Sequence, residues 1–228
     1  MREKGIFINL GLVDYRKAWE LQHRFWKNRV ARILPDIVLF LEHPHTITLG
    51  RRGNKSHLKA SPETLERLEV PVIQVERGGD VTYHGPNQAV VYPILHLEEF
   101  ELNVTEYVER LEECIIQVLK YFAIEGKRSP QNRGVWVGED KIASIGVTVS
   151  KGVSFHGLAL NYNTNLKYFD LINACGLENK KMTSMAKLLG REISKDDLYK
   201  SLRSQFKNLF KKDWQEKQLM EVEDLLKE

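Results

Sequence analysis

Residues 77–88 are the part of the chain whose composition is best suited to holding a ligand. Three glycines, a proline and an asparagine in this segment rule out a regular helix or a central strand. The paired glycines let the backbone approach a ligand closely, while Arg77 supplies a fixed cation and His84 a titratable group. A structural turn has the same composition and is the alternative. The segment is neither a Walker loop nor a dinucleotide site, because no Gly-Lys-Ser/Thr follows and the GxGxxG spacing is absent.

Two β-rich segments carry further candidate residues. Lys141 begins an apolar strand of small residues, where a lysine is either a solvated strand end or a functional ammonium that faces a pocket. In the strand predicted over residues 153–161, Gly157 and Ala159 lack large side chains and leave room for another group to pack.

The two cysteines are predicted to differ in role. Cys114 lies on the apolar stripe of the clearest predicted helix, where a cysteine behaves as a small hydrophobe. Cys175 stands beside Gly176 after an apolar stretch, in a predicted loop. Two cysteines are too few for a disulfide-rich secreted scaffold or a four-thiolate zinc site. His43 and His45 alternate, but no further ligand follows at a recognisable spacing, so we expect no metal.

Composition narrows the class of protein. The chain has 228 residues, of which 42% are hydrophobic, and this is enough for a sizeable core. Its 34 Lys+Arg against 31 Asp+Glu give a net charge of +3, which is no signature of nucleic-acid binding. The apolar run at residues 37–41 is far too short to span a bilayer. We therefore expect a soluble cytoplasmic protein that binds neither nucleic acid nor membrane.

Hydrophobic periodicity predicts strands and helices that interleave without a strict repeat. Asp14, Ser61 and Asn103 are suitable caps for three of the helices. We predict an α/β (α+β) fold with one domain over residues 1–228, in which helices flank a mixed, largely antiparallel sheet and residues 191–228 form a helical C-terminal extension. Strands are predicted at residues 6–10, 37–41, 46–49, 72–75, 89–95, 134–137, 141–149 and 153–161, and the last two helices at residues 194–210 and 214–226.

The glycine-rich segment matches a family motif, Arg-Gly-Gly-x-x-Thr-aromatic-His-x-x-(Gly or His)-Gln, except at Asn87, where glycine is usual. On this motif the chain resembles the lipoate-pathway octanoyltransferases, which move an octanoyl group from acyl carrier protein to a lysine of a lipoyl domain. Asn87 tolerates a left-handed backbone better than most residues, and Ala174, in place of the usual proline, only loosens a preset φ. Further matching blocks lie in the family's order at residues 42–44, 48–53, 141–147, 156–161, 175–176 and 183–185.

This resemblance implies the fold of the lipoate and biotin protein ligase catalytic domain, and a reaction without cofactor or metal. It implies that Cys175 accepts the acyl group and that Lys141 is its partner. The implied donor is octanoyl-acyl carrier protein; the implied acceptors are the lipoyl domains of 2-oxoacid dehydrogenase complexes and the glycine cleavage H protein. A monomer is expected. The residues implied to line the acyl pocket are Arg77, Gly78, Gly79, Asp80, Val81, Thr82, Tyr83, His84, Ser144, Ile145, Gly146, Gly157, Leu158 and Ala159.

Three other functions fit parts of the same pattern. An ATP-dependent lipoate- or biotin-protein ligase has a similar fold and a lysine comparable to Lys141, but it needs no nucleophilic cysteine. A Cys–His hydrolase would use Cys175 with His84 or His156. A non-enzymatic acyl-protein binding module would keep Cys175 only as a core residue.

A basic stretch at residues 200–212 has two interpretations. It contains five basic residues and no acid, and its cations fall on one helical face opposite apolar residues. The face is either the solvated side of a packed helix or a docking surface for an acidic carrier protein. The cations on this face are Lys200, Arg203, Lys207 and Lys211.

Overall fold

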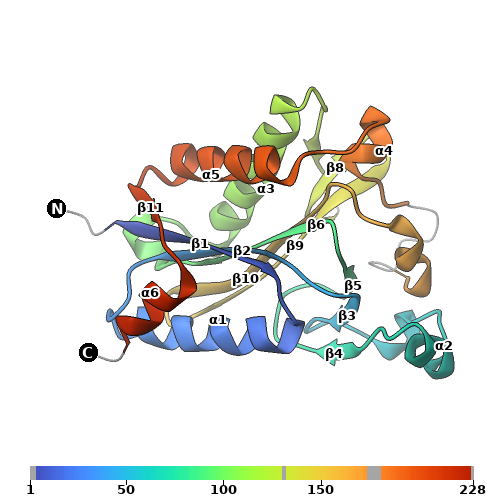
Figure 1. The fold of residues 1–228 in the computed structure, drawn as a ribbon, viewed down its shortest axis with the longest axis horizontal. Coiled ribbons are helices and arrows are strands. Elements are labelled where there is room, and N and C mark those ends of the chain that lie inside the picture. The colour runs from blue at the N-terminus through green and yellow to red at the C-terminus, as the bar shows by residue number, and fades with distance from the viewer. Residues whose placement is uncertain (1–3, 130–131, 174–180, 227–228) are drawn as a thin grey trace.

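An eight-stranded mixed sheet runs through the centre of the protein (Figure 1). The computed structural model describes residues 4–129, 132–173 and 181–226. The strand order is β11-β1-β2-β6-β10-β9-β8-β7; β1 lies parallel to β11 and β2, and the other neighbours are antiparallel. The predicted mixed, largely antiparallel sheet is therefore confirmed. Its strands are β1 (Gly5–Leu12), β2 (Ile37–Glu42), β6 (Gln88–Ile94), β7 (Lys127–Arg128), β8 (Val135–Val137), β9 (Asp140–Ser150), β10 (Val153–Asn161) and β11 (Trp214–Glu216).

A second, three-stranded sheet lies beside the first one and carries part of the glycine-rich segment. Its central strand β3 (Thr46–Leu49) runs parallel to β4 (Val72–Gln74) and antiparallel to β5 (Val81–His84). β5 is an edge strand, so the sequence was right to exclude a central one at residues 77–88. This sheet also brings residues 42–53 next to residues 77–88.

Helices cover both faces of the large sheet: α3 and α5 lie on one face, and α1 and α6 on the other (Figure 1). Predicted caps start two of them. The Asp14 side chain accepts from the backbone N–H groups of Arg16 and Lys17, and Asn103 forms a capping box with Glu106. The helices are α1 (Tyr15–Val30), α2 (Pro62–Arg67), α3 (Val104–Tyr121), α4 (Met185–Leu189), α5 (Lys195–Phe210) and α6 (Leu219–Asp224), with 3₁₀ turns at Lys55–His57, Leu97–Phe100 and Leu166–Leu171.

Cys114 belongs to the core between α3, α5 and the large sheet. It is fully buried, and it clusters with Leu111, Ile115 and Val118 of the same helix. Burial raises the pKa of its thiol to about 12, so it stays protonated near neutral pH. The interpretation of Cys114 as a small structural hydrophobe is confirmed.

The predicted helix over residues 214–226 begins instead as a strand. Residues 214–216 form β11, and a helix follows only at Leu219–Asp224. The Trp214 ring packs so closely on Gly5 that a Cβ at Gly5 would lie 2.4 Å from it, and the Gly5 N–H donates to the Asp213 carbonyl. These contacts with β1, which are far away in sequence, outweigh the local preference for a helix.

The basic face of α5 is only partly solvated. Leu202 and Phe206 are buried against the sheet, while Lys207 and Lys211 are exposed on the opposite side. The Arg203 guanidinium forms an ion pair with Glu216 of β11. This arrangement is that of a packed amphipathic helix, and one of its cations helps to hold the C-terminal strand.

A buried group of ionic residues fastens the segment between α5 and β11. Asp36, fully buried, accepts a hydrogen bond of 2.8 Å from the Arg29 guanidinium and another from Lys212. Glu99 completes the group with an ion pair to Arg29. Removal of one partner from such a group would leave an uncompensated buried charge.

Candidate active site

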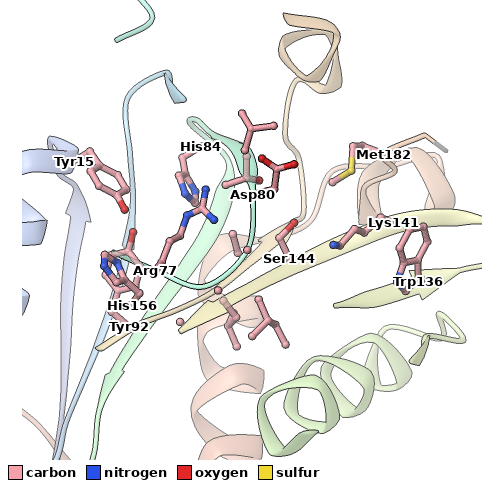
Figure 2. A pocket seen from close by; sticks show the side chains of 18 of the residues that line it. Tyr15, Arg77, Asp80, His84, Tyr92, Trp136, Lys141, Ser144, His156 and Met182 are labelled. Atoms are coloured by element: carbon pink, nitrogen blue, oxygen red, sulfur yellow. The ribbon is translucent and has the colours of Figure 1, made fainter. Parts of the chain in front are cut away.

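The glycine-rich segment crosses onto the edge of the large sheet and closes a cavity there (Figure 2). The Gly78 N–H donates to the Val147 carbonyl of β9 at 2.9 Å. The register of the next two strands pairs Gly146 with Gly157. The cavity is lined by Arg77, Gly79, Asp80, Val81, Thr82, His84, Lys141, Ser144, Ile145, Gly146, Gly157, Leu158 and Ala159, all of them expected from the sequence, and by Tyr15, Tyr92, Trp136, His156, Lys181 and Met182.

Two residues expected in the acyl pocket lie elsewhere. Gly78 lines an adjoining groove. Tyr83 points away from the cavity, because successive side chains of a strand alternate. Its ring stacks on Tyr168, and its hydroxyl lies 2.7 Å from Nδ1 of His45. Tyr83 thus supports the small sheet from behind.

Four of the added lining residues carried no signal in the sequence. Tyr15 is the first residue of α1, Tyr92 lies in β6, Trp136 in β8, and Met182 follows residues 174–180. Each comes from an element whose place beside the cavity depends on strand order. No spacing along the chain reveals that order.

Lys141 is buried at the side of the cavity opposite Tyr15 and His156 (Figure 2). Its side chain is only 5% exposed, and its Nζ lies 5.5 Å from the centre of the Trp136 ring. Gly134 leaves room for it, since a Cβ there would lie 2.6 Å from Cε of Lys141. Lys141 therefore faces a pocket, and its functional role stays a prediction.

Cys175 and Ala174 lie outside the described residues, but the described chain on both sides of residues 174–180 is well fixed. On the far side, the Lys141 N–H donates to the Lys181 carbonyl and the Thr183 N–H donates to the Lys141 carbonyl, both at 2.9 Å. On the near side, the Asn173 N–H donates to the His57 carbonyl at 2.7 Å. Lys181, the first described residue after this gap, is thus bonded to the backbone of Lys141.

Arg77 holds the cavity wall together. Its Nε and Nη2 donate to the Thr48 hydroxyl at 3.1 and 2.8 Å, Nη2 also donates to the Thr48 carbonyl, and Nη1 donates to the Gly78 carbonyl. Gly50 and Gly146 pack against it so closely that a Cβ on either would lie within 3.2 Å of Arg77 side-chain atoms. The fixed cation expected here is thus also the scaffold of the turn.

Neutral polar groups gather at the far side of the cavity (Figure 2). Nδ1 of His43 donates to the Val13 carbonyl, so Nε2 accepts from the Tyr92 hydroxyl at 2.8 Å. Burial lowers the pKa of His43 to about 4 and raises that of Tyr15 to about 12. Burial, with His43 and Arg77 nearby, also holds the pKa of His84 well below its usual range. These imidazoles are therefore uncharged at neutral pH.

His156 occupies an unusual backbone conformation inside β10. Its φ is +56°, and its N–H donates to Oε1 of Gln22 at 2.8 Å, which gives this buried amide of α1 a hydrogen-bond partner. Its Nε2 lies 3.7 Å from Oε2 of Glu76. Burial favours the neutral acid of Glu76, but the His156 ring and the Trp19 N–H outweigh this and lower its pKa to about 2. Glu76 is therefore a permanent anion behind the cavity.

The departure from the family motif at Asn87 has a simple geometry. Asn87 has a φ of +62°, the left-handed conformation expected of a residue in place of glycine. Its N–H donates to Glu42 at 2.9 Å, and Glu42 also accepts from the Tyr162 hydroxyl at 2.6 Å. Although burial opposes ionisation, the bonds from Tyr162 and Lys195 hold the pKa of Glu42 below its usual range. Glu42 thus anchors the turn at residue 87.

Gly157 is small for a different reason from the one expected. A Cβ at Gly157 would lie 2.1 Å from the Val91 carbonyl oxygen of β6. The missing side chain therefore lets two strands approach closely, at a residue that also lines the cavity. Ala159, which also lines the cavity, has its neighbour Ser144 directly across the β9–β10 pair.

Two absences concern the described residues alone. Within residues 4–129, 132–173 and 181–226, no three His, Cys, Asp or Glu side chains gather as a metal site. In the same part of the chain, no helix combines the length and apolarity needed to cross a bilayer.

Comparison with known proteins identifies the family of the chain. The family model described as the lipoyl protein ligase A/B catalytic domain matches residues 14–207. A protein of Syntrophobacter fumaroxidans named octanoyltransferase is 57% identical over 226 residues, which cover 99% of each chain. Another octanoyltransferase, of Caldicellulosiruptor bescii, is 44% identical over 205 residues, or 89% of this chain and 90% of that one.

Solved structures share the fold at low sequence identity. A crystal structure of lipoate-protein ligase A bound with ATP has a TM-score of 0.78 and 13% identity, covering 99% of this chain and 93% of that one. The biotin protein ligase of Aquifex aeolicus in complex with biotin and ATP has a TM-score of 0.56 and 13% identity, covering 92% and 71%. The expected likeness to the lipoate and biotin ligase fold is confirmed.

Proposed function

Because the chain belongs to the family of lipoyl protein ligase A/B catalytic domains, we propose that it transfers an octanoyl group from acyl carrier protein to a lysine of a lipoyl domain. The observation that carries this proposal is the 57% identity to an octanoyltransferase over 99% of both chains. The cavity described above supports it, since thirteen of the expected site residues line that one cavity.

The cavity suits the acyl chain. Ile145, Leu158 and Ala159 give its lining apolar side chains. Each CH₂ of an octanoyl chain buried there gains about 0.8 kcal/mol. The carbonyl end would then lie near Lys141, where the chemistry takes place.

The first half-reaction uses Cys175 as the nucleophile. A thiol with an ordinary pKa of about 8.5 is only a few per cent thiolate at neutral pH, and an adjacent ammonium stabilises the anion. Lys141, bonded through its backbone to Lys181 and Thr183, is the candidate ammonium. The Cys175 thiolate attacks the thioester carbonyl, the bond to the carrier sulfur breaks, and the leaving thiolate takes a proton from Lys141.

The second half-reaction moves the octanoyl group to the acceptor. The acceptor lysine amine attacks the acyl-Cys175 thioester and gives a proton to neutral Lys141. The bond to Cys175 breaks, and the thiolate beside the reprotonated Lys141 is restored. The incoming thioester is already activated, so the cycle needs neither ATP nor metal.

The test is intact-mass analysis of the protein after incubation with octanoyl-acyl carrier protein in the absence of ATP. We expect an octanoyl adduct on Cys175 that disappears when a lipoyl domain is added, with octanoylation of one lysine of that domain. The matched control is Cys114→Ala, which removes the other cysteine and keeps the adduct, whereas Cys175→Ser loses it.

Three outcomes would contradict the proposal in whole or in part. Transfer that starts from free octanoate and requires ATP would identify a ligase. An adduct that forms on Cys175 at the same rate in Lys141→Ala would remove Lys141 from the first step and favour a histidine partner, His84 or His156. A protein that binds the carrier but never forms an adduct would be a binding module.

The remaining parts of the proposal concern setting and partners. We place the reaction in the cytoplasm, with lipoyl domains of 2-oxoacid dehydrogenase complexes and the glycine cleavage H protein as acceptors. Residues 1–228 act as one catalytic domain and as a monomer in this proposal. Its C-terminal part, residues 191–228, contributes α5, β11 and α6, and none of its described residues, 191–226, lines the cavity.

A further inference from the structure

A wide groove of about 660 Å³ adjoins the acyl cavity. Lys141, Gly79 and Gly146 line both hollows, so the two meet where the thioester would react. A donor whose acyl chain fills the cavity must lead its sulfur substituent away from Lys141. The groove provides that path, and its size is typical of a site for a ligand of several hundred daltons.

One wall of the groove is an open stretch of strand edge. β8 pairs with β9 only as far as Ala143, and Gly78 then pairs with Val147. Within the described residues, no strand pairs with Ile145 on this side. Because backbone groups two residues apart point in the same direction, the N–H and C=O of Ile145 point to the side of β9 on which Ala143 pairs with β8 and Val147 with Gly78. Such an edge binds amide-containing chains in extended form.

The other walls carry two cations. Arg52 is exposed, forms no ion pair with any described carboxylate, and is fixed by its own N–H, which donates to the Gly79 carbonyl at 3.1 Å. Arg133 is half-exposed, with Nη1 3.6 Å from both Glu109 and Glu112. The lining also includes the Asp80 carboxylate, which lies 2.7 Å from Nδ1 of His57, and Val104, which is 49% exposed.

We propose that this groove binds the phosphopantetheine arm of the acyl donor, with its phosphate between Arg52 and Arg133. The inference rests on the proposed transfer from a carrier thioester. The arm consists of a thioester, two amides, a hydroxyl beside two methyl groups, and a phosphodiester. With the thioester at Lys141, the amides would lie along the open edge at Ile145, the two methyl groups beside Val104, and the phosphate between the arginines. The acceptor lysine is a poorer occupant, because it is short and its cation would be repelled by both arginines.

The experiment compares two small donors that differ only in the phosphate, octanoyl-pantetheine and octanoyl-4′-phosphopantetheine. Release of the donor thiol is followed in the presence of a lipoyl domain, and the ratio of the two kcat/KM values is the readout. We expect the wild-type protein to prefer the phosphorylated donor by about tenfold, mostly through KM. Arg52→Gln should bring the ratio close to one, and added salt should reduce it in the wild type.

A matched control and a second arginine make the result specific. Arg67→Gln removes another exposed arginine, on α2 and outside both hollows, and should keep the tenfold ratio. Arg133→Gln should lower the ratio as Arg52→Gln does, and its unfolding midpoint shows whether the loss of the contacts to Glu109 and Glu112 has disturbed the fold.

Three results would overturn the inference. A wild-type ratio near one would mean that the groove does not recognise phosphate. A tenfold ratio that survives both Arg52→Gln and Arg133→Gln would place the phosphate elsewhere. In both cases acyl transfer itself would stand. If the wild-type protein took octanoate from neither donor nor from the full carrier protein, the proposed function would fall, and this inference with it.

Discussion

Replacement of Gly134 by alanine tests whether the position of Lys141 matters. Gly134 has a φ of +121°, and its N–H donates to Oε1 of Glu112 at 2.9 Å. A Cβ at this position would lie 2.4 Å from the Ala143 carbonyl oxygen, 2.6 Å from Cε of Lys141 and 3.2 Å from its Nζ. The strand backbone at Ala143 cannot yield easily, so the Lys141 side chain must move.

The magnitude has two parts. A residue other than glycine at such a φ is strained by about 1–3 kcal/mol, and overpacking a closed site adds about 1–3 kcal/mol. Gly134→Ala should therefore lower the free energy of unfolding by about 2–6 kcal/mol. Displacement of the ammonium by about 1 Å should slow acylation of Cys175 by about a hundredfold.

Gly138 in the same hairpin supplies the matched control. Its φ is +59°, and a Cβ there would meet no atom within 4 Å. Gly138→Ala should lower stability by about 1–2 kcal/mol from backbone strain alone and leave acylation unchanged. The assays are urea denaturation and the rate of thiol release from octanoyl-acyl carrier protein at a temperature where both variants are folded. Equal acylation rates in Gly134→Ala and Gly138→Ala would refute the reasoning.

Three further predictions concern the frame of the site. Gly157→Ala would place a Cβ 2.1 Å from the Val91 carbonyl oxygen, so it should destabilise the protein by about 3 kcal/mol or more in urea denaturation, and a loss below 1 kcal/mol would contradict the tight β6–β10 contact. Cys114 should escape alkylation by iodoacetamide at pH 8 until the protein is unfolded, because burial raises the pKa of its thiol to about 12. Labelled Cys114 in the native protein, detected by peptide mass analysis, would contradict this prediction. The free energy of unfolding should fall by about 2 kcal/mol between pH 7 and pH 5 from His43 alone. Burial lowers the native pKa of His43 to about 4, whereas the pKa in the unfolded chain is near 6.5, so the unfolded chain binds the proton first as the pH falls. A flat profile of unfolding free energy over this range would show that His43 is not buried and neutral.

Local signals in the sequence predicted most elements but not their neighbours. Asp14 and Asn103 cap α1 and α3 as expected, and α5 spans Lys195–Phe210, one residue from the predicted start. The sequence did not reveal β11, because Trp214 takes its conformation from packing on Gly5. A contact that distant in sequence leaves no periodicity for a local pattern to detect.

Site residues could be predicted where their chemistry is distinctive, and they were missed where only the three-dimensional arrangement of the elements places them beside the cavity. The glycine-rich segment and Lys141 were singled out by their residue types, the family resemblance assigned them to the site, and they line one cavity. Tyr15 and Trp136 were missed because an aromatic residue in a helix or strand is ordinarily interpreted as part of the hydrophobic core. Gly157 was found for the wrong reason: small size in a strand signals close packing, but not what packs there.

The parallel pairing of β1 with β11 has a consequence for synthesis on the ribosome. β1 is made long before its outer neighbour, residues 214–216, emerges. At about 5–20 residues per second, the free edge of β1 stays open for about 10–40 s. During that interval its unpaired backbone groups are a template for other nascent chains. The ion pair between Lys212 and the buried Asp36 carboxylate then holds the segment that leads into β11 in place.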